Sequence, residues 1–333
     1  MSRIQVLSRL RPDPYIVALL ATVALASVLP ARGAVAGGLG YATTIAIGFL
    51  FFLYGVRLST REALDGLKQW RLHIVVFAST FVLFPLLGLA AKVLVPGVLT
   101  PELYTGLMFL CCLPSTVQSS IAFTSIARGN VAAAICSASF SNLIGILLTP
   151  LLVAVFLFTG GGGVSLGSVR DIMLELLAPF VAGQLLRRWI GPFVTGRKKV
   201  LGYVDRGSIL LVVYSAFSEG VVAGIWGRLT FASLAVLLLV NALLLAIVMM
   251  ATMSTARRLG FARDDEIVIV FCGSKKSLAS GVPMATVLFP AAAAGVVVLP
   301  LMLFHQLQLV VCAWLARRYA IHRELEPSNT ADS

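Results

Sequence analysis

The chain has 333 residues, of which 59% are hydrophobic and only 12% are charged, and its formal net charge is +12. This balance excludes an ordinary soluble globular protein. A basic excess would suggest nucleic-acid binding in a soluble chain, but we expect no nucleic-acid partner here, because the basic residues follow a membrane topology.

Apolar runs near the ~20 residues that a membrane-spanning helix needs recur along the chain. We predict ten spans, at residues 14–31, 40–56, 73–95, 103–126, 131–158, 172–190, 202–225, 229–253, 266–288 and 293–316. With the N-terminus in the cytoplasm, twenty Lys and Arg residues lie inside and four outside, namely Arg32, Lys92, Arg170 and Arg228. This positive-inside bias predicts a multi-pass protein of the cytoplasmic (inner) membrane, embedded in the lipid bilayer, with both termini in the cytoplasm.

The third span carries Thr80, a weaker site candidate, because a hydrogen bond to its own helix explains it. The fourth span is broken by a polar run from Cys111 to Ser120, whose candidate site residues are Ser115, Thr116, Gln118, Ser119 and Ser120. Such side chains either replace the freed backbone hydrogen bonds or bind an ion. Their oxygens suit a hard cation, and the half-helix N-terminus suits an anion.

The fifth span adds Ser137, Ser139, Ser141 and Asn142. These polar residues either join helices, as is common in membrane bundles, or reach the site. Asn142 has the highest cost of burial among them and is the strongest site candidate, together with Ser139.

An offset of 157 to 160 residues maps one half of the chain onto the other and places Cys112 over Cys272. We therefore predict a first repeat at residues 1–158, a second at 159–320 and a disordered cytoplasmic tail at 321–333. Five spans per repeat is an odd number, so the two halves are inverted in the membrane.

The second half holds Glu219, the only carboxylate well inside a span, which either belongs to the site or lies near the outer interface at the end of the seventh span. A second polar break interrupts the ninth span. The candidates in that break are Ser274, Lys275 and Ser277, and Lys276 lies beside them. A charge at mid-bilayer costs at least a few kcal/mol and normally faces a cavity with a partner. Lysine there pairs with an anion or carries a proton; alternatively, one of the two lysines snorkels to the surface. We expect Lys275 to face the site, with Lys275 and Glu219 as coupling candidates.

Several motifs resemble the bile acid:sodium symporter family. They are Ala127-Arg128-Gly129-Asn130-Val131-Ala132, Leu148-Thr149-Pro150-Leu151-Leu152 and Phe51-Phe52-Leu53-Tyr54-Gly55-Val56-Arg57-Leu58. The stretch from Phe271 to Met284 is similar to the divergent SBF-like branch of that family. The likeness covers essentially all ten spans.

The resemblance implies an all-α fold of two inverted five-helix repeats, with a panel domain (spans 1, 2, 6 and 7) and a core domain (spans 3–5 and 8–10). Broken spans 4 and 9 would cross in the core, with sodium at the crossing and the substrate in the cleft between domains. By position, Ser119, Ser120 and Asn142 resemble a sodium shell, and Thr80 lies near a family glutamine. However, Phe271 stands where bile acid carriers have a sodium-ligating glutamate, and Lys275 stands where they have a glutamine. Coupling to sodium or to protons therefore stays open.

Our hypothesis is a secondary transporter of a small organic solute, preferably an anion, with no enzymatic activity and no cofactor beyond a candidate sodium ion. Three alternatives remain. In an arsenite-type efflux carrier, Cys111 or Cys112 would be the thiol ligand. In an intramembrane hydrolase, Ser119 and Lys275 would form the catalytic dyad. The third alternative is a transport-inactive regulator.

Overall fold

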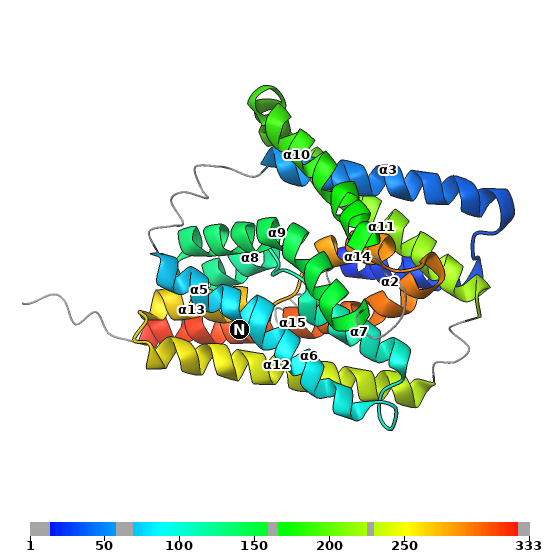
Figure 1. The fold of residues 1–333 in the computed structure, drawn as a ribbon. Helices are drawn as coiled ribbons and strands as arrows, with labels where there is room; N and C mark the ends of the chain where they lie inside the picture. Colours follow the sequence, from blue (N-terminus) through cyan, green and yellow to red (C-terminus); the bar gives the residue numbers. More distant parts are fainter. Residues whose placement is uncertain (1–13, 58–68, 159–165, 225–229, 326–333) are drawn as a thin grey trace, which may run out of the picture. The chain divides into compact units, whose positions relative to one another are not determined.

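The computed structural model describes residues 14–57, 69–158, 166–224 and 230–325, which are helical, with no strand among them (Figure 1). These residues cluster into two compact units. Unit 1 holds residues 14–57, 179–224 and 289–295, and unit 2 holds residues 69–158, 166–178, 230–288 and 296–325. We describe each unit by itself.

Unit 1 is built on α2 (Pro14–Val28), α3 (Gly33–Arg57), the larger part of α10 (Leu166–Gly196) and α11 (Lys198–Val222). Helix α11 packs against both α2 and α3. The hydroxyl of Tyr214 on α11 donates to the carbonyl oxygen of Leu29 at 2.7 Å. Arg57, at the end of α3, forms an ion pair with Asp205 of α11. Polar contacts therefore hold α11 in place in an otherwise apolar helix group.

Helices α3 and α10 approach each other through two glycines. A Cβ atom on Gly55 would overlap the carbonyl oxygen of Phe180, and one on Gly183 would overlap that of Phe52. Small residues of this kind let membrane helices pack backbone to backbone, where burial of apolar surface gives no driving force. The contact therefore requires glycine at both positions.

Replacing Gly55 with alanine is expected to lower the free energy of unfolding by about 1–3 kcal/mol or more, the usual cost of overpacking. Gly48→Ala is a matched control on the same helix, because nothing lies within 4 Å of a Cβ atom there. It should be neutral or stabilising by up to about 1 kcal/mol. Unfolding of the two purified variants in detergent would compare them, and equal stabilities would contradict the close contact.

Unit 2 contains a long segmented helix formed by α5 (Trp70–Ala78), the π-helical turn η3 (Ser79–Leu83), α6 (Phe84–Ala90) and η4 (Ala91–Leu94). Three further long helices accompany it: α9 (Val131–Val153), which continues as η5 (Ala154–Phe158), α12 (Phe231–Arg258) and α15 (Ala291–Leu325). Side-chain oxygens cap two of these helices, since Asn130 accepts from the N–H of Ala133 and Thr230 from that of Ser233.

Two pairs of shorter helices complete the unit: α7 (Pro101–Cys112) with α8 (Gln118–Ile126), and α13 (Arg263–Gly273) with α14 (Leu278–Leu288). Helix α13 packs against α5, α8, α9 and α12, which surround it in Figure 1. In the apolar part of the α13–α14 span, 94% of the residues are buried, against 33–50% in the other candidate spans. The α13–α14 segment is therefore the centre of unit 2.

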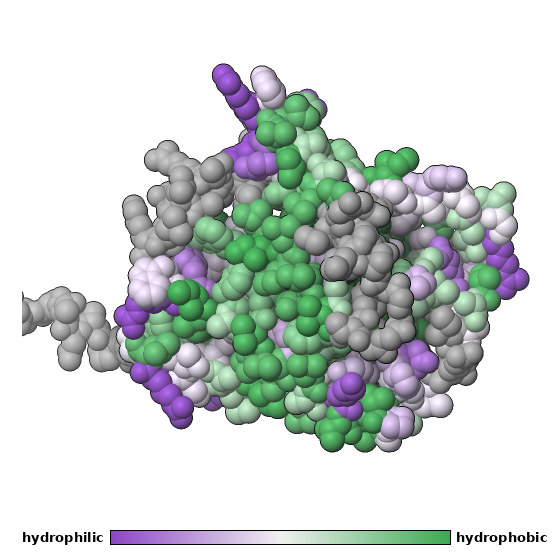
Figure 2. All heavy atoms as spheres, viewed as in Figure 1, coloured by the Kyte–Doolittle hydropathy of each residue, from purple (hydrophilic) through white to green (hydrophobic). Residues whose placement is uncertain are grey.

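Seven helical segments among the described residues are long and apolar enough to cross a membrane, and Val17–Val28 is a shorter apolar helix. Hydrophobic side chains also cover much of the face seen in Figure 2. Three of the ten predicted spans are not among the seven, and the first of them contains the short helix Val17–Val28. The fourth forms the broken pair α7 and α8, and the sixth lies within α10.

The all-helical fold is thus confirmed, whereas the arrangement in ten spans and two inverted repeats stays a prediction. The predicted boundary between the repeats, at residue 159, lies outside the described residues. Helix α15 continues to Leu325, so it includes the first residues of the tail that was predicted to be disordered at 321–333. The helix extends past Ala320 because residues 321–325 contain neither glycine nor proline.

Candidate functional site

Unit 2 contains two helices that are interrupted inside apolar stretches. The first break, residues 113–117, separates α7 from α8, and the second break, residues 274–277, separates α13 from α14. Pro114 contributes to the first interruption because its nitrogen carries no hydrogen to donate. Both breaks coincide with the polar runs that the sequence singles out.

The two breaks satisfy each other's backbone groups. The N–H of Ser277 in the second break donates to the carbonyl oxygen of Pro114 at 2.9 Å. The hydroxyl of Ser115 in the first break donates to the carbonyl oxygen of Cys272 at 2.6 Å. Because an unpaired backbone group costs several kcal/mol in hydrocarbon, the contact explains how two interruptions persist in one apolar unit.

Two side chains from α9 hold this contact together. Ser141 Oγ accepts a hydrogen bond from the N–H of Ser115 at 2.9 Å, and Asn142 Nδ2 donates to the Ser115 carbonyl oxygen at 2.8 Å. Asn142 Oδ1 accepts from the hydroxyl of Ser280, in the first turn of α14, at 2.7 Å. Asn142 therefore joins the first break to the helix that follows the second.

Three hydroxyl groups gather where α8 begins. Thr116 Oγ1 lies 2.9 Å from Ser119 Oγ and 2.8 Å from Ser120 Oγ. The hydroxyl of Ser120 also donates to the carbonyl oxygen of Phe271, at the end of α13, at 3.1 Å. This hydroxyl cluster (Thr116, Ser119 and Ser120) faces the end of the other broken helix.

Lys275 lies beside the hydroxyl cluster and is fully buried. Its ammonium makes one hydrogen bond, to Ser119 Oγ at 3.4 Å, and lies over the rings of Phe123 and Phe271, 4.6 and 5.7 Å from their centroids. Within the described ranges, no carboxylate pairs with it. A buried cation with one long hydrogen bond retains the capacity to bind an anion.

Lys276, the next residue, is fully buried as well but makes three short hydrogen bonds to backbone oxygens, at 2.6–2.9 Å. The alternative that one of these lysines snorkels to the surface is therefore wrong. Both ammonium groups lie inside the helix group, since each finds oxygen or aromatic partners there.

The remaining predicted residues are scattered. Gln118 is exposed, Ser139 is half-buried, and the hydroxyls of Thr80 and Ser274 each donate to a carbonyl four residues earlier in their own chain segment. Ser277 Oγ accepts from the N–H of Ser280 at 3.2 Å and so caps α14. Glu219 lies in unit 1, half-buried, 3.5 Å from Ser215 Oγ.

Sequence reasoning overlooked Gln308 of α15, whose side-chain amide binds both the N–H and the carbonyl group of Lys276. Its Oε1 accepts from the Lys276 N–H at 2.8 Å, and its Nε2 donates to the Lys276 carbonyl at 3.0 Å. The two glutamines in the apolar run of α15, Gln306 and Gln308, were the available signal, since such side chains are rarely buried without partners.

Known proteins resemble this chain over almost its whole length. The model of the SBF-like CPA transporter family matches residues 13–321. The chain belongs to this family. It is 57% identical to "Uncharacterized protein PA2026" of Pseudomonas aeruginosa over 95% of both chains, and 54% identical to "Putative symporter YfeH" of Escherichia coli over 92% of both. It is 29% identical to sodium/bile acid cotransporter 7-A of Xenopus laevis, over 92% of this chain and 91% of that protein.

Membership of the SBF-like family confirms the predicted kinship with the bile acid:sodium symporters and makes the chain a transporter with several membrane-spanning helices, not an enzyme. The hydrolase alternative is thereby excluded. The Ser119–Lys275 contact that it needs does exist, but it lies in a transporter.

In this SBF-like chain the three residues suggested for sodium do not fit a common ion site. Ser119 accepts a hydrogen bond from the Lys275 ammonium, so a sodium ion at Ser119 and Ser120 would lie beside a second positive charge. Asn142 Oδ1 accepts from Ser280 instead. The ligand oxygens are present, but the Lys275 ammonium lies beside them.

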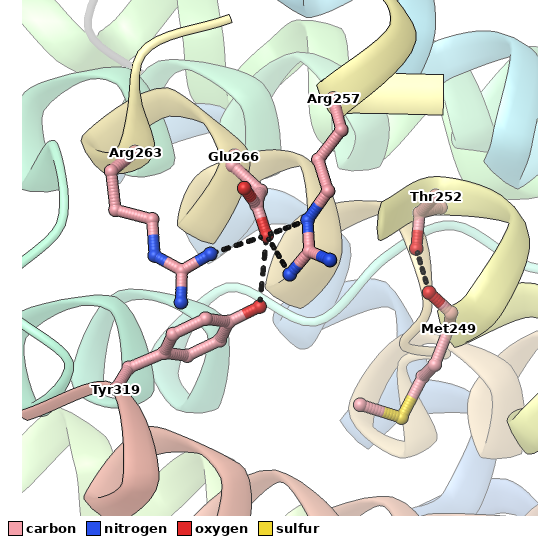
Figure 3. A network of polar contacts seen from close by, with 6 residues as sticks. All are labelled: Met249, Thr252, Arg257, Arg263, Glu266 and Tyr319. Atoms are coloured by element: carbon pink, nitrogen blue, oxygen red, sulfur yellow. Dashed lines mark hydrogen bonds and ion pairs between the residues drawn. The ribbon is translucent and has the colours of Figure 1, made fainter. Parts of the chain in front are cut away.

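The SBF-like core is also fastened at the start of α13 by a buried carboxylate. Figure 3 shows Glu266 between two guanidinium groups, with Arg263 Nη1 at 2.8 Å and Arg257 Nε at 3.2 Å from its Oε1, and the Tyr319 hydroxyl at 3.4 Å. These partners come from α12, α13 and α15, so one carboxylate holds three helices together.

We expect Glu266→Gln to lower the free energy of unfolding by about 1–3 kcal/mol, because it leaves charged donors around an uncharged amide. Glu102→Gln, in the exposed first turn of α7, is the matched control and should change it by less than about 0.5 kcal/mol. Denaturation of both variants in detergent would measure the difference. A Glu266→Gln protein as stable as Glu102→Gln would contradict this structural role.

Proposed function

We propose that the chain is a secondary transporter of a small organic anion, with its site at the two breaks and with Lys275 as the group that binds the anion. The observation that carries the proposal is the buried ammonium of Lys275, which has one long hydrogen bond and no paired carboxylate in the described part of the chain. A charge in that position requires a counter-charge or the loss of its proton.

Two half-helices add to the attraction for an anion. Helices α8 and α14 both begin at the breaks, and the N-terminus of a helix carries a partial positive charge. In transporters with broken helices, such ends point at anionic parts of the substrate. The breaks therefore combine the ammonium groups of Lys275 and Lys276 with the positive ends of two helices.

We propose further that protons, not sodium ions, couple the transport. With Lys275 protonated, the ammonium binds the anion and the pair crosses without net charge; proton loss then releases the anion on the other side. Proton and anion thus move in the same direction. The relatives named as symporters or sodium/bile acid cotransporters support co-transport in general, and the ammonium beside Ser119 favours the proton in this chain.

The architecture that we propose for this activity is two inverted five-span repeats in the inner membrane, with both termini cytoplasmic. The two broken pairs have similar builds, with 12 and 9 residues in α7 and α8 and 11 in each of α13 and α14. The division into units also groups residues 14–57 with 179–224, as a panel domain of spans 1, 2, 6 and 7 would require.

An arsenite-type carrier, whose thiol ligand would have to be Cys111 or Cys112, is less favoured, because the relatives are named as a symporter and a sodium/bile acid cotransporter. A transport-inactive regulator would differ from a transporter in that it moves no solute across the membrane. Uptake assays in proteoliposomes separate these functions.

The test is uptake of a library of radiolabelled organic anions, and of arsenite, into proteoliposomes under imposed proton or sodium gradients. We expect at least one organic anion to accumulate when the proton gradient is imposed, and its uptake to be unaffected by a sodium gradient. Accumulation driven by sodium alone would overturn proton coupling. Arsenite flux, or no flux under any gradient, would overturn the anion carrier itself.

A further inference from the structure

Lys276 occupies a cage of carbonyl oxygens that contains no acidic side chain among the described residues. Its Nζ donates to the carbonyl oxygens of Thr80, Cys111 and Leu113 at 2.8, 2.9 and 2.6 Å. The same atom lies 4.1 Å from the ring centroid of Phe84. All three N–H groups of the ammonium are thus used, and an aromatic face covers it.

Two of the three oxygens are available because α7 stops. The last four carbonyls of a helix have no partner within it, and α7 ends at Cys112. The carbonyl of Cys112 itself accepts from Thr149 Oγ1 at 2.9 Å, which leaves those of Cys111 and Leu113 for the lysine. The C-terminal end of a helix also carries a partial negative charge that attracts cations.

The third oxygen is available because the π-helical turn η3 meets a proline. The N–H of Phe84, four residues after Thr80, donates to the carbonyl of Ser79. The residue five positions after Thr80 is Pro85, which has no N–H. The carbonyl of Thr80 therefore lacks a helical donor, and Lys276 supplies one.

Three neutral carbonyls, a helix C-terminus and an aromatic face form the surroundings that proteins use for a bare monovalent cation. The backbone of Lys276 is clamped as well, by the two hydrogen bonds from the Gln308 side chain. These contacts hold the residue in a single place, unlike the loosely bound ammonium of Lys275.

We infer that the cage is a monovalent-cation site, and that the chain fills it with its own ammonium instead of a free ion. The lysine joins η3, the end of α7 and the second break, so unit 2 folds without sodium or potassium. The inference is independent of the transport proposal, because it concerns stability and its test involves no flux.

The test uses two substitutions of the same residue in the full-length protein. Lys276→Ala empties the cage and leaves room for an ion, whereas Lys276→Met fills it with an apolar chain. Thermal unfolding of each purified protein in detergent is measured in choline, sodium, potassium or methylammonium chloride at equal ionic strength. We expect the unfolding temperature of the wild type to be the same in all four salts.

For Lys276→Ala in choline we expect an unfolding temperature about 5–10 °C below that of the wild type. Methylammonium, sodium or potassium should restore at least half of that loss, and the recovery should saturate as the concentration of the cation rises. Lys276→Met should be destabilised in every salt, with no recovery. A Lys276→Ala protein that behaves alike in all salts would overturn the inference, and so would a Lys276→Met protein as stable as the wild type.

If the Lys276→Ala protein cannot be purified in choline, it is extracted and purified in methylammonium throughout. A monodisperse protein obtained only with methylammonium supports the cage. Failure with both cations overturns it, because a cation site must accept a free cation once its own is removed.

Discussion

Anion uptake by the Lys275→Gln variant should fall about 30-fold or more below that of the wild type. Truncating one partner of a buried charge pair typically costs about 2–5 kcal/mol, and each 1.4 kcal/mol is tenfold in binding. Glutamine retains a hydrogen-bond donor for Ser119 but provides neither a charge nor a proton to exchange. The loss should therefore appear under every imposed gradient, measured with an anion that the wild type accumulates in proteoliposomes.

The folded state should not suffer from the same change. Lys275 makes one hydrogen bond, at 3.4 Å, so the unfolding temperature of Lys275→Gln should equal or exceed that of the wild type. Lys92→Gln, at an exposed position of η4, serves as the control for the loss of one positive charge. A Lys275→Gln variant with normal uptake would remove this lysine from the mechanism. Equal losses of uptake in both variants would point to a general effect of charge.

The helical membrane fold was predictable because a bilayer admits few kinds of element. Long apolar runs specify helices, and the polar runs around Pro114 and Lys275 predict where two of these helices are interrupted. The ends of the helices were less predictable. Helix α15 passes into residues 321–325 because helix propensity continues past the end of the predicted apolar span at residue 316, which hydropathy alone does not show.

The site was predictable as a pair of breaks but not as a set of bonds. Hydropathy marks Lys275 and Lys276 alike, and the expectation that Lys275 faces the site did not say how either ammonium is bound. Lys276 reaches three carbonyls that helix ends and a π-helical turn expose, whereas Lys275 reaches one hydroxyl. Gln308 escaped detection because its role depends on which face of α15 meets the second break, and an apolar helix gives no periodic signal for that face.

Replacing Asn142 with alanine should reduce stability and uptake together, because this side chain connects the two broken helices. It donates to the Ser115 carbonyl at 2.8 Å and accepts from Ser280 Oγ at 2.7 Å, so its removal leaves a carbonyl and a hydroxyl without these partners. Each unsatisfied group costs about 1–3 kcal/mol, so the two groups predict a loss of about 2–6 kcal/mol in the free energy of unfolding. Ser139→Ala, one turn earlier on α9, should change it by less than about 0.5 kcal/mol.

A double-mutant cycle with Ser280→Ala isolates the bond that Asn142 makes to α14. Two side chains in direct contact show coupling energies of at least about 0.5 kcal/mol, whereas independent sites add within about that amount. We therefore expect the double variant to be more stable than the two single losses together would give. Additive losses would mean that Asn142 supports only the first break. Coupled losses with normal uptake would mean that the connection stabilises the fold without taking part in transport.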